Sequence, residues 1–315
     1  MAELTICIPA YKAAGTIGET LKSLQVQTDK DFKTIVVLDG PDPETKDAIK
    51  QNRGLLDLDI VELKKNGGCG HARNAGLDHC DTKYIAWLDA DDLYMPYAVD
   101  QINQAIAAYF DWYAGKFIQR TPRGYYIRGN EHNTWMHGRV YNVDFLKYHK
   151  IRCPDENRIA DDFPFNILCR EFGVTVREGD LPIALYRPNE SSATLQADAR
   201  LKQALEYIKG NMHYVRTAMR ERPAEKLNQL PQVIVMSYFY LDFAVYMYMI
   251  QDVKKREEDF KALAEYVDLE KLLKNERFEA MIDHWLLTPS RPYPDNPIPP
   301  QETFMDMLQR LEIVE

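Results

Sequence analysis

The sequence has few of the features that mark exported proteins, disulfide frameworks or zinc sites. Its five cysteines are an odd number and no two form a CxxC pair, so neither a disulfide framework nor a zinc site is indicated. The first residues run from Met1 into an apolar stretch without the basic region or cleavage site of a signal peptide. We therefore expect a protein of a reducing, cytoplasmic compartment.

Basic residues are outnumbered by acidic ones. The chain has 39 Lys+Arg against 48 Asp+Glu, a formal net charge of -9, which argues against a general affinity for phosphate backbones but permits a local basic channel. Residues 233–250 form the one apolar run long enough to suggest a membrane span. Asp242 and several tyrosines within that run favour a buried amphipathic helix instead, because an intramembrane carboxylate is costly.

Short apolar runs alternate with helical stretches from residue 4 to about residue 110. We expect strands at 5–11, 33–39, 58–63 and 83–89, separated by helices at 14–27, 42–53 and 70–80. This order predicts an α/β fold with a parallel sheet, 315 residues being enough for one large core and a smaller helical unit. Ligands of such sheets bind at the carboxyl ends of the strands.

The later sequence is less regular. We expect a hairpin around Pro122 and Gly124, a helix at 160–173 that ends at Gly173, and a further strand at 174–187. From residue 196 the pattern is strongly helical until a proline-rich linker near 288–300. The predicted organisation is an α/β domain at 1–195 and a C-terminal helical region at 196–315.

Two segments near the predicted strand ends are only weak signals of ligand binding when each is taken alone. Asp39 follows the second strand and precedes a glycine, so it could accept from a ligand, but capping of the turn and the next helix is the simpler interpretation. Residues 66–76 form a glycine-rich turn before a helix, and such a turn can offer N–H groups to an anion. The segment lacks the Lys-Ser/Thr of a P-loop and the GxGxxG of a dinucleotide fold.

The segment YIAWLDADD is more demanding, because three carboxylates crowd the end of a buried strand. Asp89, Asp91 and Asp92 need a compensating cation, N–H donors or a proton, and the Asp-x-Asp spacing suits a hard divalent cation that also grips phosphates. Asp161 and Asp162 form a second acidic pair, which taken alone is typical of a helix N-cap and first turn. His137 is interpreted as an ordinary polar residue.

These segments together resemble the family 2 glycosyltransferases, which have the GT-A fold. The resemblance covers about residues 4–195. It rests on TICIPAY, on the stretch ending at Asp39, on NGGCGHARNAGL, on YIAWLDADD, and on TWMHGRVYNVDFL followed by ENRIADDFPFN. Five such segments occur in the family's order and spacing, and the α/β domain is accordingly identified as a GT-A catalytic domain.

The resemblance implies roles for individual residues. Asp162 would be the catalytic base and Asp91 the ligand of a divalent metal ion, Mn²⁺ or Mg²⁺. Donor-binding residues would be Pro9, Tyr11, Asp39, Arg73, Asp89 and Ala90, with Tyr11 and Asp39 at the nucleoside base and Asp89 at the ribose. One position departs: Asn189 stands where the family commonly has a histidine that helps to bind metal or diphosphate.

The resemblance implies an inverting, metal-dependent transfer of a sugar from a nucleoside diphosphate donor, with a UDP-sugar favoured, to a hydroxyl of a saccharide or glycan. Two alternatives stay open. One is glycosylation of a modified nucleobase in DNA, for which Arg120, Arg123 and Arg128 could form a local groove. The other is a non-catalytic nucleotide-sugar binding module. A sugar-nucleotide pyrophosphorylase is disfavoured, because IPAYKAAGTIG lacks that enzyme class's glycine-rich loop.

Overall fold

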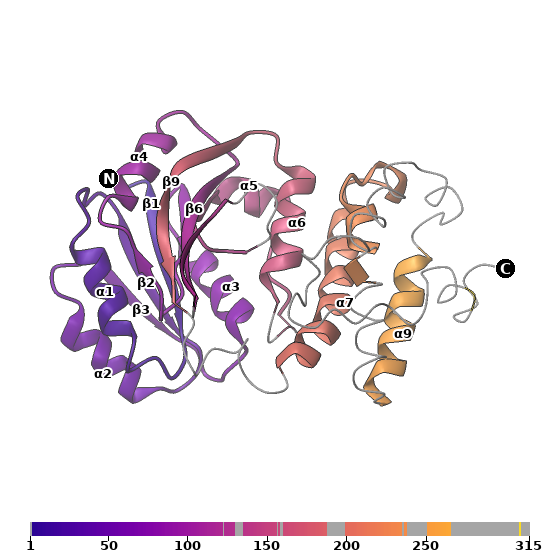
Figure 1. The fold of residues 1–315 in the computed structure, drawn as a ribbon, viewed down its shortest axis with the longest axis horizontal. Helices are drawn as coiled ribbons and strands as arrows, with labels where there is room; N and C mark the ends of the chain where they lie inside the picture. The colour runs from indigo at the N-terminus through magenta and orange to yellow at the C-terminus, as the bar shows by residue number, and fades with distance from the viewer. Residues whose placement is uncertain are drawn as a thin grey trace. The chain divides into compact units, whose positions relative to one another are not determined.

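A computed structural model of the chain describes residues 2–121, 123–129, 135–155, 157, 160–187, 199–234, 236–237, 251–265 and 309. The chain divides into two compact units, Met1–Gln196 and Ala197–Glu315. Figure 1 shows the first unit as strands with helices on both sides.

The first unit opens with alternating strands and helices, as predicted. They are β1 (Leu4–Ala10), α1 (Ile17–Gln25), β2 (Lys33–Leu38), α2 (Pro43–Asn52), β3 (Leu58–Glu62), α3 (Cys69–His79) and β4 (Tyr84–Trp87). The four strands are parallel and lie in the order β3-β2-β1-β4. The sequence predictions for these strands and helices are confirmed to within a few residues at each end.

Strand β1 is buried along its whole length because helices cover both of its faces. Leu4, Ile6 and Ile8 belong to a core that includes apolar residues of α1, α2 and α4 (Ala98–Ile106). Cys7, on the opposite face, packs against α3. In Figure 1, α1 and α2 accordingly lie to the left of the strands, and α3 and α6 to the right.

The contact between α3 and the sheet requires a glycine. A Cβ added at Gly76 would lie 2.2 Å from the Cys7 sulfur, a separation that real atoms do not allow. Without that side chain, α3 packs directly on β1 and β2, with Val37 beside the same position. This close packing fixes the position of α3 on the sheet. It therefore also fixes the position of Arg73, which lies on α3, relative to the carboxyl ends of the strands.

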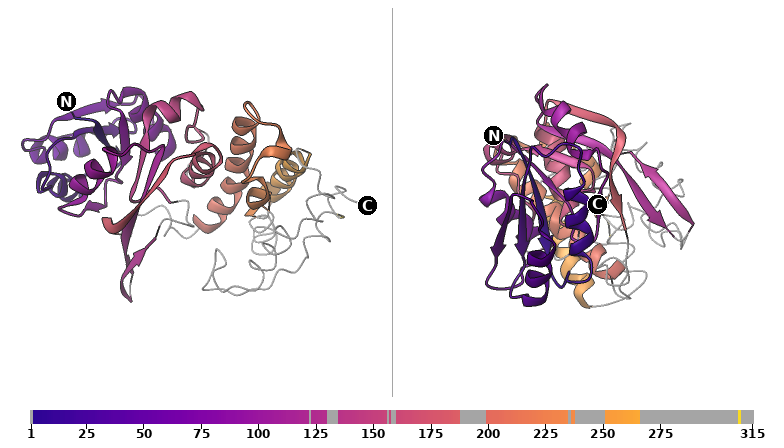
Figure 2. Two further views of the ribbon diagram at one scale, coloured as in Figure 1. Left: turned by 90° about the horizontal axis from the view of Figure 1, so that it is seen from above. Right: turned by 90° about the vertical axis from the view of Figure 1, so that its left-hand side faces the viewer.

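The second half of the first unit adds antiparallel pairing to the sheet. Its elements are β5 (Leu93–Tyr94), α4, β6 (Trp112–Thr121), β7 (Gly124–Arg128), β8 (Arg139–Asn142), α5 (Val143–Tyr148), α6 (Asp162–Phe172) and β9 (Val176–Tyr186). The complete sheet has the order β3-β2-β1-β4-β8-β6-β9-β5, with β7 paired to β6. The predicted hairpin, the helix that ends at Gly173 and the last strand are confirmed. The β6–β7 hairpin extends away from the body of the unit (Figure 2).

The strand order reverses direction at β1. The chain adds β2 and β3 on one side of β1 and then returns to place β4 on the other side. Connections that diverge in this way leave an opening above the carboxyl ends of the two central strands, where ligands of open α/β sheets bind. The residues that follow β1 and β4 therefore border the place where a ligand is expected.

The second unit is helical where it is described. It contains α7 (Ala199–Ala218), the short helix η2 (Ala224–Lys226) and α9 (Gln251–Ala264). Most of the run 233–250 and the whole proline-rich linker near 288–300 lie outside the described residues. None of the helices within the described part is long and apolar enough to cross a membrane.

Candidate functional site

The predicted donor-binding residues lie at the carboxyl ends of neighbouring strands. Tyr11 follows β1 and is 47% exposed, whereas Pro9 is buried within β1 opposite Val37. Asp39 follows β2 and is buried, and Asp89 comes two residues after β4. The carbonyl of Ala90 accepts a hydrogen bond of 2.9 Å from the Thr20 hydroxyl.

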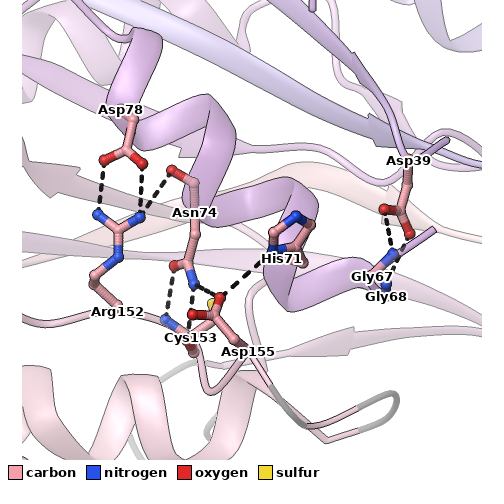
Figure 3. A network of polar contacts seen from close by, with 9 residues as sticks. All are labelled: Asp39, Gly67, Gly68, His71, Asn74, Asp78, Arg152, Cys153 and Asp155. Atoms are coloured by element: carbon pink, nitrogen blue, oxygen red, sulfur yellow. Dashed lines mark hydrogen bonds and ion pairs between the residues drawn. The ribbon is translucent and has the colours of Figure 1, made fainter. Parts of the chain in front are cut away.

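Asp39 binds the glycine-rich turn that precedes α3 (Figure 3). Its two carboxylate oxygens accept from the backbone N–H groups of Gly67 and Gly68, each at 2.8 Å. The capping interpretation is therefore wrong, since Asp42 caps α2 by accepting from the Thr45 N–H. The glycine-rich turn does offer N–H groups to an anion, and among the described contacts that anion is the Asp39 carboxylate.

Arg73 joins the two acidic segments of the chain. Its guanidinium donates to Asp161 at 2.6 Å and to Asp89 at 2.8 Å, and its side chain is only 6% exposed. Burial alone would lower the pKa of Arg73, but Asp161 and Asp89 raise it well above its usual value. Arg73 is thus a fixed positive charge that holds the end of β4 beside the start of α6.

A loop beside α3 supports this arrangement (Figure 3). Asn74, which is buried, donates to the Cys153 carbonyl at 2.9 Å and to the Asp155 carboxylate at 2.7 Å, and it accepts from the Cys153 N–H at 3.0 Å. A Cβ at Gly70 would lie 3.1 Å from the Cβ atoms of both Cys153 and Asp161. The loop can therefore approach α3 closely enough for Asp161 to reach Arg73.

The acidic loop after β4 meets a histidine from a distant part of the chain. The His137 Nε2 atom lies 2.9 Å from Asp92 Oδ2 and 3.7 Å from Asp89 Oδ2. One ligating atom from each of these three residues lies within 4.8 Å of the other two, a spacing that could hold a metal ion. The sequence interpretation of His137 as an ordinary polar residue did not foresee its contacts with Asp89 and Asp92.

The register of the antiparallel pair β4–β8 explains why His137 reaches this place. Tyr84 lies opposite Asn142 and Ala86 lies opposite Val140. Continuing this one-for-one register past the ends of both strands brings His137 level with Asp89. Nothing local in the sequence indicates this pairing, because the two strands are separated by about fifty residues of sequence.

Asp91, the predicted metal ligand, is partly exposed and lies between Asp89 and Asp92 in the loop. Its backbone carbonyl accepts from Arg187 Nε at 2.8 Å. The side chain of Asp92 is fully buried, and its Oδ1 atom accepts from the Arg187 N–H at 2.8 Å. Arg187 thus holds the outer end of the acidic loop at two points. Asn189 lies outside the described residues.

The charges of this cluster shift one another's pKa values. Burial alone would raise the pKa of Asp89, but Arg73 and His137 outweigh it and the pKa is lowered. Burial raises the pKa of Asp92 against the influence of His137. For His137, burial is outweighed by Asp92 and Asp89, and its pKa is raised. The raised pKa values of Asp92 and His137 and the lowered pKa of Asp89 thus arise from one set of coupled charges.

The acidic pair at the start of α6 differs from the sequence interpretation in one respect. Asp161 occupies the N-cap position but makes no capping hydrogen bond, because its carboxylate binds Arg73 instead. Asp162 is the first residue of α6 and is partly buried. Burial and the negative charge of Asp161 raise the pKa of Asp162 to about 6, although Arg73 and His137 act in the opposite direction. Asp162 can therefore exchange a proton near neutral pH.

The residues around the acidic loop suit a divalent cation. Two carboxylates and an imidazole form a mixed oxygen and nitrogen donor set, and the Asp92 carboxylate is buried where a charge needs compensation. Carboxylates alone suit Mg²⁺, whereas an imidazole favours a transition metal such as Mn²⁺. Among the two ions that the sequence suggests, this donor set fits Mn²⁺ better.

Residues 5–166 match the model of a protein family described as Glycosyl transferase family 2. An uncharacterized glycosyltransferase of Rickettsia prowazekii is 40% identical over 101 residues, which make up 32% of this chain and 31% of that protein. The chain therefore spans less than a third of the length of this relative.

Solved structures share the fold. That of S. aureus TarS 1-349 in complex with UDP-GlcNAc has a TM-score of 0.64 at 17% identity, over 91% of this chain and 85% of that one. A mannosyltransferase from Pyrobaculum calidifontis, in complex with GDP-Man and Mn²⁺, has a TM-score of 0.53 at 17% identity, over 89% and 83% of the two chains. The predicted GT-A fold is confirmed.

The loop beside α3 should depend on Asn74 more than on its other polar contacts. We expect Asn74→Ala to lower the free energy of unfolding by about 2 kcal/mol or more, because it leaves the Cys153 N–H and C=O without their partner in a buried place. Arg152→Ala, which removes the exposed pair with Asp78 beside the same loop, should cost less than about 1 kcal/mol. Urea unfolding of both variants measures the difference, and equal losses would contradict this assignment.

Proposed function

Because the chain belongs to glycosyl transferase family 2, we propose that residues 1–195 catalyse transfer of a sugar from a UDP-sugar to a hydroxyl of a saccharide acceptor, with inversion at the anomeric carbon. The observation that carries this proposal is the double ion pair of Arg73. It holds Asp89, on the donor side, and Asp161, next to the candidate base Asp162, at one place.

Asp162 is suited to the role of general base. A base works best when its pKa lies near the working pH, and the pKa of this carboxylic acid is raised to about 6. In the proposed step the ionised carboxylate takes the proton of the acceptor hydroxyl while that oxygen forms a bond to the anomeric carbon. The bond from this carbon to the donor phosphate oxygen breaks on the opposite face, and UDP leaves with the bonding electron pair.

The residues that follow the strands are suited to hold the donor. Tyr11 presents an exposed ring at the end of β1, and the Asp39 carboxylate lies at the end of β2. Asp39 accepts one N–H on each oxygen, and a carboxylate has capacity for about two further donors, such as the imide N–H of a uracil ring. A TarS structure of the same fold contains UDP-GlcNAc, which supports UDP as the nucleotide proposed for this chain.

The acidic loop with His137 is suited to hold a divalent cation. Asp89 and Asp92 supply carboxylates and His137 supplies an imidazole, and these are the three residues whose ligating atoms lie close together. Asp91, the ligand that the resemblance implies, is not in this group of three but lies between the two carboxylates in the loop. The family commonly has a histidine at the position of Asn189. When bound, such a cation offsets the negative charge that grows on the departing diphosphate. Arg73 and His137 lower the pKa of Asp89 and so favour the ionised carboxylate, which is the form that binds a cation.

Nucleotide selectivity tests the donor assignment. UDP should protect the protein against thermal unfolding more than CDP or ADP does, because an acceptor aimed at the imide leaves other bases with unpaired polar groups. Asp39→Asn should bring the UDP and CDP affinities closer together. The ratio of the two affinities is the readout, since loss of the contacts to Gly67 and Gly68 would weaken both alike. Equal protection by all three nucleotides in the unmodified protein would refute the assignment.

Asp162 and Asp161 should differ in what they control. Asp162→Asn should lower the transfer rate by about a hundredfold to ten-thousandfold with nearly unchanged UDP-sugar affinity. In the unmodified protein the rate should fall as the pH drops below about 6, because the raised pKa means that the acid form then predominates. Asp161→Asn should instead lower stability, because it removes a partner of buried Arg73. A folded, inactive Asp161→Asn beside an active Asp162→Asn would reverse the roles.

Metal preference distinguishes the carboxylate ligands of the acidic loop from the imidazole of His137. Asp91→Asn should weaken the binding of Mn²⁺ and of Mg²⁺, because it removes an oxygen donor that suits both. His137→Ala should weaken Mn²⁺ more than Mg²⁺, by about tenfold or more, since imidazole favours the transition metal. Calorimetric titration in the presence of UDP measures both ions, with exposed His79→Ala as the control histidine. An unchanged ratio in His137→Ala would exclude an imidazole ligand.

A further inference from the structure

The β6–β7 hairpin has a charge that differs from that of the rest of the chain. Between Trp112 and Gly129 the sequence contains four basic residues, Lys116, Arg120, Arg123 and Arg128, and no acidic residue, although the whole chain has a net charge of -9. Arg120, Arg123 and Arg128 are exposed, and none of them forms an ion pair with a carboxylate that the structure describes. This cluster of positive charge is thus open to an anion from outside.

The same hairpin exposes large apolar and aromatic side chains. Tyr125 is 67% exposed and Ile127 is 65% exposed, and Tyr126 is exposed beside them. The hairpin extends away from the body of the first unit (Figure 2), so its own sheet covers little of this surface. Exposed tyrosines next to arginines are suited to a ligand of two kinds of group. The tyrosine rings can pack against sugar rings or a polyol chain, and the arginines can bind negatively charged groups.

The two faces of the hairpin are not equivalent. Residues directly opposite each other in an antiparallel pair share a face, and successive residues alternate between faces. Phe117 pairs with Arg128 and Gln119 pairs with Tyr126, so these four residues share one face. Arg120 pairs with Tyr125, and Ile118 pairs with Ile127, on the other face.

The face that carries Tyr126 and Arg128 begins at Phe117, which is buried beside the candidate active site. The Phe117 ring lies 5.2 Å from the His137 ring and 5.5 Å from that of Trp135, which is 36% exposed. Gln119 lies about 7 Å further along the strand and Thr121 about 14 Å further. A chain-like ligand on this face could therefore have one end at the site and the rest along the hairpin.

Arg128 is arranged to hold an anion on this face. Its Nε atom donates to Gln119 at 2.8 Å, and its guanidinium carbon lies 5.8 Å from the centre of the Tyr126 ring. These contacts order the guanidinium while its four other N–H bonds suit a phosphate group, which arginine binds with two parallel hydrogen bonds. Lysine would not offer the same planar pair of donors.

We propose that the hairpin face that carries Gln119, Tyr126 and Arg128 binds the acceptor, and that the acceptor is a phosphate-bearing saccharide or polyol chain. The proposal rests on the glycosyl transfer proposed above, which requires a hydroxyl acceptor at Asp162. A chain-like acceptor of this class supplies the hydroxyl, the phosphates that fit the arginines and the apolar ring or polyol surfaces that fit Tyr126. The acidity of the whole chain confines this attraction to the hairpin.

Matched double variants test the proposal. Tyr126→Ser with Arg128→Glu changes the face that leads to the site, and Tyr125→Ser with Arg120→Glu makes the same chemical changes on the other face. Binding of fluorescently labelled poly(glycerol phosphate) should weaken by about tenfold or more in the first variant, and much less in the second. UDP binding should be unchanged in both, which shows that the fold and donor site are intact. Equal losses in both variants, or no loss in either, would overturn the proposal.

Other polymers identify the class of ligand. Neutral dextran should bind at least tenfold more weakly than poly(glycerol phosphate), because it lacks the phosphates that the arginines bind. Stronger binding of a single-stranded oligothymidylate, or of phosphatidylglycerol vesicles, would overturn the proposal in favour of a nucleic acid or a membrane surface. If poly(glycerol phosphate) binds as expected but no UDP is released from any UDP-sugar, the proposed transfer fails while the binding face stands.

Discussion

The site depends on one buried guanidinium. Arg73 makes ion pairs with Asp89 and Asp161, from segments about seventy residues apart in the sequence. A buried charge costs several kcal/mol unless partners compensate it, so the guanidinium requires both carboxylates and the carboxylates require the guanidinium. Close packing at Gly70 and Gly76 lets α3 reach the positions at which these pairs form. The position of α3 on the sheet therefore determines where Arg73 holds Asp89 and Asp161.

The crowded carboxylates of the first unit are compensated in different ways. Asp39 receives two backbone N–H groups, Asp89 and Asp161 share Arg73, and Asp92 lies against His137 and the Arg187 N–H. For Asp162 burial and the charge of Asp161 prevail, and its pKa rises to about 6. Asp162 thus differs from Asp89, whose pKa is lowered. This difference gives the acidic residues of one site separate chemical properties.

The parallel half of the sheet could be predicted from sequence because its signals are local. Each expected strand and helix between residues 4 and 80 has its own apolar period, and the βα order dictates parallel pairing. His137 could not be placed in the same way, because its position depends on the pairing of β8 with β4. Asp161 was predicted to cap a helix, which is the usual local role of such a residue. A contact with Arg73 across the fold overrides that local preference, and no local pattern announces it.

The division of the sheet also bears on how the chain is made. Strands β1 to β4 pair only with one another until β8 arrives, so the parallel half can assemble while the later residues are still being synthesised. During that interval Arg73 has only Asp89 as a carboxylate partner, and Asp92 has neither His137 nor the Arg187 N–H. The partners that complete the site, Asp161, His137 and the Arg187 N–H, all come from the second half of the unit, so the site is complete only when that half joins the parallel strands.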